Sequence, residues 1–406
     1  MAENTIKLNN QMGSEEKPIP VGRVVAIICL CTLFLNIASY KFIPMQAVIK
    51  EFFNVGDAAY GYLTSSNNWL MIAVSVPMGY LVRKWKPKNS MLLGFAVAIL
   101  GIVIQALATS FPLFVVGRVV EGAGYGLATL VTSSLLINVV GSAKAGLWMS
   151  VSMALTVGSQ IITTKVGTAL IYDAGINFKL LFWAIGALEL VVLLVWVLLI
   201  PKNVKIYGTS NAAKPTKEQT RRVYKNKSGW FVAIALGLFN CVGVAFPSYI
   251  IQYWVGKGMT QAEAANTHSI TTLISLGAML AFGFISDRLH TKRKIVIFSF
   301  FSAMCALILL ALLPANLMWI YVIIYGTLPR SIAGLTNASA ADLAEVPADV
   351  PIVNSTRNTI VNILGVVFAI GLGYGVQFLG YQITIFIMSG FMLIGAILWI
   401  LAKKIP

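Results

Sequence analysis

The stretch "GFISDRLHTKRK" (residues 283–294) decides the fold, because a similar stretch occurs in the first half of the chain. That counterpart reads "GYLVRKWKPKNS" (79–90), and aligning Gly283 with Gly79 brings basic residues of the two stretches into register. The two glycines lie 204 positions apart, which is about half of the 406-residue chain. Similarity at this offset predicts two halves of related structure.

The composition places most of the surface in lipid. Hydrophobic residues make up 58% of the chain and charged residues only 11%, whereas a soluble protein carries about 25% charged residues. The formal net charge of +16 does not indicate nucleic-acid binding, because the basic residues gather in short connectors between apolar segments. We therefore expect a membrane protein with a small-molecule partner and a lipid environment, and no nucleic acid.

Twelve windows are long and apolar enough to cross a bilayer, which takes about 20 residues. Each should be a helix, because backbone groups in lipid are satisfied within their own segment. The predicted fold is all-α, with twelve transmembrane helices in two six-helix bundles. The windows are 22–49, 58–82, 89–110, 112–140, 145–172, 177–200, 229–256, 263–286, 294–313, 316–345, 351–378 and 381–402.

The basic residues also predict the orientation. Of 30 lysines and arginines, 22 fall in the termini and the even-numbered connectors and only three in the odd-numbered ones. This bias predicts a multi-pass protein of the cytoplasmic (inner) membrane with both termini inside. We expect a disordered tail (1–20), an N-terminal bundle (21–201), a basic linker (202–228) and a C-terminal bundle (229–406).

Two motifs give the chain a family resemblance. Gly283, Asp287 and Arg288, followed by basic residues, resemble the loop motif of the major facilitator superfamily, although Arg83 replaces the aspartate in the first-half copy. The segment "GRVVEGAGYGLA" (117–128) is similar to the family's arginine- and glycine-rich fourth helix. The resemblance covers essentially the whole chain. It implies a secondary transporter in which Asp287 and Arg288 act in gating, and helices 1, 4, 7 and 10 line a cavity.

Glycines in an apolar span indicate close helix packing rather than a nucleotide loop. The fifth span reads "TVGSQIITTKVGTAL" (156–170), without the glycine–proline motif that is typical of drug exporters in this family. The four cysteines lie in apolar segments and predict packing rather than metal binding or disulfides. We expect no cofactor, no metal and no enzymatic activity, since no nucleophile–base or metal-ligand pattern is present.

Five cations lie inside the predicted spans, where a charge costs at least about 2.5–3.5 kcal/mol and usually marks a pathway. Arg118 and Glu121 are three residues apart on one helix and should pair, as a candidate coupling and gating site. The other four have no carboxylate nearby in sequence, so an anionic substrate is the expected partner. These candidate substrate-binding cations are Lys41, Lys165, Arg330 and Arg357. Each can alternatively extend to the membrane surface.

Polar and aromatic residues on the presumed lining helices complete the candidate substrate site: Tyr40, Asn67, Asn240, Tyr249 and Asn358. Asparagines can equally bond between helices. The sequence therefore predicts a monomeric secondary transporter that moves a small organic anion, most simply a carboxylate, by alternating access. Coupling is to a proton or sodium ion, or by anion exchange. An exporter of drug-like or cationic compounds is the alternative, and a channel, enzyme or sensor fits less well.

Overall fold

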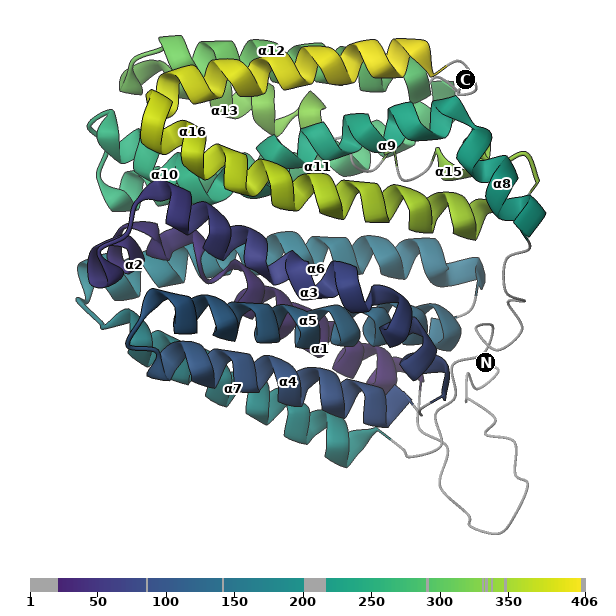
Figure 1. Cartoon of the computed structure of the whole chain (residues 1–406), viewed down its shortest axis with the longest axis horizontal. Coiled ribbons are helices and arrows are strands. Elements are labelled where there is room, and N and C mark those ends of the chain that lie inside the picture. Colours follow the sequence, from purple (N-terminus) through teal and green to yellow (C-terminus); the bar gives the residue numbers. More distant parts are fainter. Residues whose placement is uncertain are drawn as a thin grey trace. The chain divides into compact units, whose positions relative to one another are not determined.

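Helices form nearly all of the chain that the computed structural model describes, and this part contains no β-strand (Figure 1). The described residues are 21–84, 87–140, 142–200, 217–289, 292–330, 332, 335–336, 339–346 and 349–402. The expected tail and most of the expected linker lie outside them. The all-α prediction is confirmed.

Helices occupy all six predicted windows of the first half. The elements are α1 (Val21–Tyr40), η1 (Ile43–Met45), α2 (Gln46–Phe53), α3 (Asp57–Lys84), α4 (Pro87–Leu107), α5 (Phe111–Val140), α6 (Ser142–Thr168), the π-helical η2 (Ala169–Asp173) and α7 (Phe178–Leu199). The first window is not one straight helix, because Pro44 lacks the amide hydrogen that a continuous helix would need. The chain turns at residues 41–42 and continues as η1 and α2.

The second half is more interrupted. Its elements are α8 (Lys217–Lys225), α9 (Lys227–Asn240), the π-helical η3 (Cys241–Ala245), α10 (Pro247–Gly256), α11 (Gln261–Leu289), α12 (Lys292–Leu312), η4 (Ala315–Leu317), α13 (Met318–Gly326), η5 (Leu328–Arg330), α15 (Ala340–Leu343) and α16 (Val350–Leu401). The last two predicted windows share α16, which breaks at Gly380, where φ is +78°. A positive φ suits glycine because it has no Cβ.

Several of these helices have the length and apolar composition of membrane-spanning helices. Six described helices are long and apolar enough to cross a membrane, or seven if the bent pair Lys227–Gly243 and Pro247–Gly256 counts as one span. The helices α3, α6 and α11 are 28, 27 and 29 residues long but carry more polar residues. Their length is sufficient to cross a bilayer.

The chain divides into two compact units. Among the described residues, the first contains 21–41, 66–162 and 176–200, and the second contains 42–65, 163–175 and 217–402. The second unit thus includes short segments from three helical regions of the first half. The expected domain boundaries at 201 and 229 stay a prediction.

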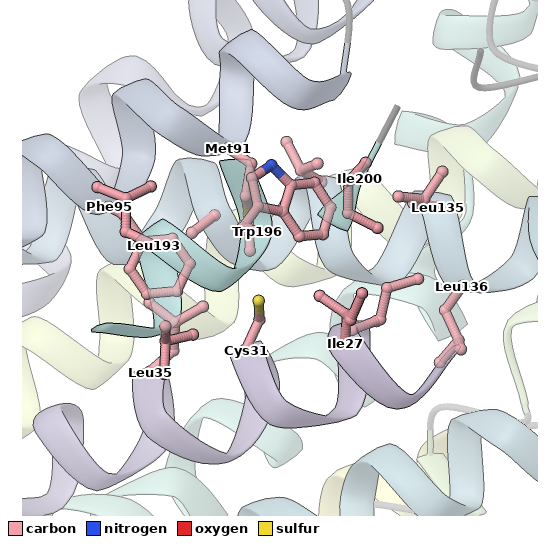
Figure 2. Packing of buried hydrophobic residues seen from close by; sticks show 14 of the residues in the cluster. Ile27, Cys31, Leu35, Met91, Phe95, Leu135, Leu136, Leu193, Trp196 and Ile200 are labelled. Atoms are coloured by element: carbon pink, nitrogen blue, oxygen red, sulfur yellow. The ribbon is translucent and has the colours of Figure 1, made fainter. Parts of the chain in front are cut away.

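The core of the first unit lies between α1, α4, α5 and α7 (Figure 2). Cys31 on α1 is fully buried in this cluster, and Trp196 on α7 is also fully buried. The packing role expected for Cys31 is confirmed.

Close packing of α4 against α5 depends on glycines. A Cβ added at Gly124 would overlap the backbone of Ala98 and Gly94, and one added at Gly101 would overlap the backbone of Glu121. A Cβ added at Gly122 would likewise overlap the backbone of Asn67 on α3. The predicted use of these α5 glycines in helix contact is confirmed.

Replacing Gly124 with alanine is expected to lower the free energy of unfolding by about 1–3 kcal/mol, the usual effect of overpacking a tight contact. Thermal unfolding of the purified protein in detergent measures this effect. The matched control is Gly158→Ala on α6, where a Cβ would meet nothing within 4 Å. That variant should unfold at the wild-type temperature or slightly above, because alanine favours the helix. Equal stability of the two variants would contradict the packing assignment.

Candidate functional site

The end of α1 creates a buried acceptor site for cations. The last carbonyls of a helix have no partner within the helix and carry partial negative charge. Lys41 donates from Nζ to the carbonyl oxygen of Ala38 at 3.1 Å, and Arg118 donates to the carbonyl oxygen of Ser39 at 3.0 Å. The turn at residue 41 therefore brings α1 and two cationic side chains together.

Glu121 on α5 lies between these cations. Its Oε1 is 2.5 Å from Nζ of Lys41, and its Oε2 is 2.9 Å from an Nη atom of Arg118. Gln105 on α4 donates to Oε2 at 2.8 Å. All three ionic side chains are at most 5% exposed. We call Lys41, Arg118 and Glu121 the buried charge cluster.

An aromatic ring covers the lysine of this cluster. Nζ of Lys41 lies 5.0 Å from the centroid of the Phe182 ring on α7, within the range of a cation–π interaction. The lysine thus has a carboxylate, a carbonyl and an aromatic face as partners. Contacts of this kind offset the large desolvation penalty of a buried ammonium.

These contacts correct one expectation and confirm another. Lys41 was expected to lack a fixed acid, but Glu121 provides one, eighty residues away in sequence. Sequence spacing cannot reveal such a pair, because it depends on how α1 packs on α5. The predicted pairing of Arg118 with Glu121 is confirmed. Gln105 was missed, and its only sequence signal was a polar residue near the end of an apolar span.

The other predicted cations lie in varied settings. Arg357 on α16 is buried, and its Nη1 donates to the carbonyl oxygen of Thr336 at 3.0 Å. Lys165 on α6 is exposed. The side chains of Arg330 and Asp287 lie outside what the structure describes, and Arg288 is exposed. Their roles in substrate binding and gating stay predictions.

The predicted polar and aromatic ligands are also dispersed. Asn67 and Tyr249 are buried, Tyr40 and Asn240 are half-buried, and Asn358 is exposed. Tyr249 uses its hydroxyl in a helix contact, donating to the carbonyl oxygen of Asp57 at 3.1 Å. Their role in substrate binding stays a prediction.

Tyr249 belongs to a tight contact in the second unit, at the helix ends that the charge distribution places outside. Its ring packs edge-on against Tyr60, with centroids 5.7 Å apart. The backbone nitrogen of Ala58 donates to Oε1 of Gln377 at 2.9 Å. A Cβ at Gly373 of α16 would lie 3.1 Å from Cα of Gly61 on α3, so these helices touch through backbone. We call this packing of α3, α10 and α16 the outer contact.

Asp57 is fixed at the start of α3 by two further side chains. Its Oδ1 accepts from Nζ of Lys50 at 2.7 Å and from Nε2 of Gln46 at 3.0 Å. A carboxylate is favourable in the first turn of a helix because of the helix dipole. These bonds connect α2 to the outer contact.

Two ion pairs lie toward the opposite helix ends of the second unit. Lys292, from the repeated loop motif, is 2.9 Å from Asp342 on α15. Arg222 on α8 donates two hydrogen bonds to Asp349, at 2.7 and 3.0 Å, and this pairing raises the pKa of Arg222. The basic loop and the linker helix are thus tied to acids near the start of α16.

Comparison with known proteins agrees with this architecture. A model of the Major Facilitator Superfamily matches residues 28–344. A solved structure of a bacterial homolog of the human lysosomal transporter Spinster, inward-facing and unoccupied, is similar with a TM-score of 0.78 and 16% identity. The match covers 96% of this chain and 98% of that one.

The nucleoside transporter NupG has a similar structure as well, with a TM-score of 0.77, 12% identity and coverage of 94% of this chain and 100% of that one. At these identities, the solved structures establish the fold alone. The match to the family model spans more than half of the chain and includes the buried charge cluster. The chain is therefore a multi-pass membrane transporter rather than an enzyme, and it belongs to the major facilitator superfamily.

Proposed function

We propose that this chain is a secondary active transporter that moves a small organic anion and uses the buried charge cluster to couple that movement to a proton. The observation that carries the proposal is Glu121, which binds two buried cations at once, Lys41 at 2.5 Å and Arg118 at 2.9 Å. A single proton on Glu121 would weaken both ion pairs.

Protonation of Glu121 has an unequal effect on its two partners. Arg118 keeps its bond to the carbonyl oxygen of Ser39 and lies on the same helix as Glu121. Lys41 is tied to α5 through Glu121, so it loses its bond to that helix. Loss of the Lys41 bond weakens the contact between the end of α1 and α5, where the Arg118–Ser39 bond remains, and this links proton binding to a change in helix packing.

The charge balance favours an anion as the substrate. Two cations share one carboxylate in the cluster, so one positive charge is in excess there. Arg357 is a third buried cation, and its Nη1 donates to the carbonyl oxygen of Thr336. Lys165 and Arg357 remain the proposed anion ligands, and a carboxylate suits them because arginine and carboxylate form paired hydrogen bonds.

A neutral polar solute is the second candidate. Glu121 already balances Lys41, so the cluster needs an anion less than the sequence predicted. The solved nucleoside transporter with a similar fold carries a solute that has no fixed negative charge. A drug-like or cationic solute fits less well with the excess of buried positive charge.

Uptake into proteoliposomes separates these candidates. The panel contains carboxylates, inorganic anions, nucleosides and organic cations, each tested with and without an imposed pH gradient. We expect carboxylate accumulation that a protonophore abolishes, with about tenfold accumulation for each pH unit in a one-to-one, electroneutral symport. Accumulation of nucleosides or cations alone would overturn the anion assignment. Equal accumulation with and without the pH gradient would overturn the proposal of proton coupling.

A further inference from the structure

A second buried acid lies beside the charge cluster, at Glu189 in the middle of α7. Glu189 is only 1% exposed. Neither carboxyl oxygen has a hydrogen-bond partner among the residues that the structure describes. Such a group needs an explanation, since buried polar atoms in proteins are almost always hydrogen-bonded.

Glu189 lies on the same buried face of α7 as the ring that covers Lys41. Phe182, Gly186 and Glu189 lie on the buried face of α7, and Phe182 covers Lys41. A Cβ at Gly186 would lie 3.3 Å from Ile102, the neighbour of the glycine that contacts Glu121. Glu189 interacts electrostatically with both Glu121 and Lys41. Glu189 is therefore near enough to the buried charge cluster for its charge to affect Glu121 and Lys41.

Within the described parts of α1 and α4, charged residues lie far along the helices from the level of Glu189. Among the described residues, α7 packs chiefly against α4 and α1. The lysines and arginines on those helices are Lys88 and Arg23. They lie in the first turns of α4 and α1, far along the helices from Glu189. Lys88 donates hydrogen bonds there to the carbonyl oxygens of Val197 and Ile200.

The protonation of Glu189 sets the net charge of the whole group. With Glu189 ionised, two acids balance Lys41 and Arg118, and with Glu189 neutral one positive charge is left over. An ionised carboxylate that is buried and lacks hydrogen bonds is strongly disfavoured. In the arrangement described here, where Lys41 is bonded to Glu121, Glu189 should hold its proton.

We propose that Glu189 is a second proton-binding site, which releases its proton when Lys41 leaves Glu121. In that step the O–H bond of the carboxyl group breaks, its electron pair stays on the oxygen, and the proton passes to water. The freed Lys41 ammonium then stabilises the new carboxylate. The link to transport rests on the proposed coupling role of the cluster, but the protonation of Glu189 does not.

Infrared difference spectroscopy of the full chain in lipid, recorded as pH is raised, tests this directly. A neutral carboxylic acid has its own carbonyl band, and we expect a band that disappears with rising pH in the wild type and is missing in Glu189→Gln. In Glu121→Gln, which frees Lys41, the band should disappear at a lower pH than in the wild type, whereas in Lys41→Met it should persist to higher pH because the stabilising cation is gone. Glu218→Gln, at an exposed position of α8, is the matched control and should keep the wild-type band.

Two results would overturn the proposal. Identical spectra for the wild type and Glu189→Gln would mean that Glu189 carries no titrating proton. A Glu189 band that is unchanged at every pH, with or without Lys41, would mean a permanently neutral packing residue. Neither readout requires a substrate, so loss of the proposed transport function and loss of this proton site are distinguishable.

Discussion

Replacing Glu121 with glutamine is expected to abolish proton-driven uptake and to destabilise the fold by about 3–5 kcal/mol, the usual effect of removing one member of a buried ion pair. The variant leaves Lys41 and Arg118 buried without the carboxylate that binds both of them, while Gln105 loses its charged acceptor. Lys41→Met should be much milder, since it leaves the Arg118–Glu121 pair intact. Thermal unfolding in detergent ranks the variants.

Removing Lys41 should then partly rescue the glutamine variant. The double variant Lys41→Met with Glu121→Gln contains one unbalanced buried cation in the cluster, where Glu121→Gln alone contains two. A double-mutant cycle should therefore show strong coupling between the positions. Glu218→Gln, at an exposed site, should unfold like the wild type. Additive effects of the two single substitutions would contradict the ion pair as the source of stability.

Replacing Gly373 with valine is expected to stop transport almost completely while leaving a folded protein. The new side chain would collide with the backbone of Asp57 and with Cα of Gly61, so α3 and α16 could not close at the outer contact. A transporter that works by alternating access must close and reopen each side in every cycle. The variant should be held open at its outer end.

Gly371→Val, two residues away on the same helix, is the matched control because a Cβ there meets nothing within 4 Å. Accessibility is measured at Ala58→Cys, in a background without the four native cysteines, with a membrane-impermeant maleimide. Ala58 is 8% exposed, so labelling should be slow in the wild type and in Gly371→Val. It should be fast in Gly373→Val. Slow labelling in an inactive Gly373→Val variant would contradict the assignment of the outer contact as a gate.

Local pattern was sufficient to predict much of this protein. Apolar length located the helical windows, and a spacing of three residues on one helix predicted the Arg118–Glu121 pair. The glycines of α5 predicted close packing, because a residue without a side chain lets any neighbouring helix approach the backbone. Glu189 lies in the middle of an apolar window of the sequence, and its side chain is almost completely buried.

Contacts between distant segments were not predictable in the same way. The pairing of Lys41 with Glu121 depends on the turn at the end of α1 and on the packing of α1 against α5. Residues 42–65 and 163–175 belong to the same compact unit as the second half of the chain. The periodicity of the sequence does not predict this grouping. A single sequence gives helix positions, while these contacts depend on tertiary packing.

The most direct measurement of proton coupling at Glu121 compares two kinds of carboxylate flux in proteoliposomes that contain Glu121→Gln. One is accumulation driven by a pH gradient, and the other is exchange of labelled for unlabelled substrate without a gradient. We predict that the variant, once stabilised by Lys41→Met if its yield is low, retains exchange but loses gradient-driven accumulation, while the wild type shows both. Accumulation at the wild-type level, driven by the pH gradient in the absence of the Glu121 carboxylate, would contradict the proposed mechanism.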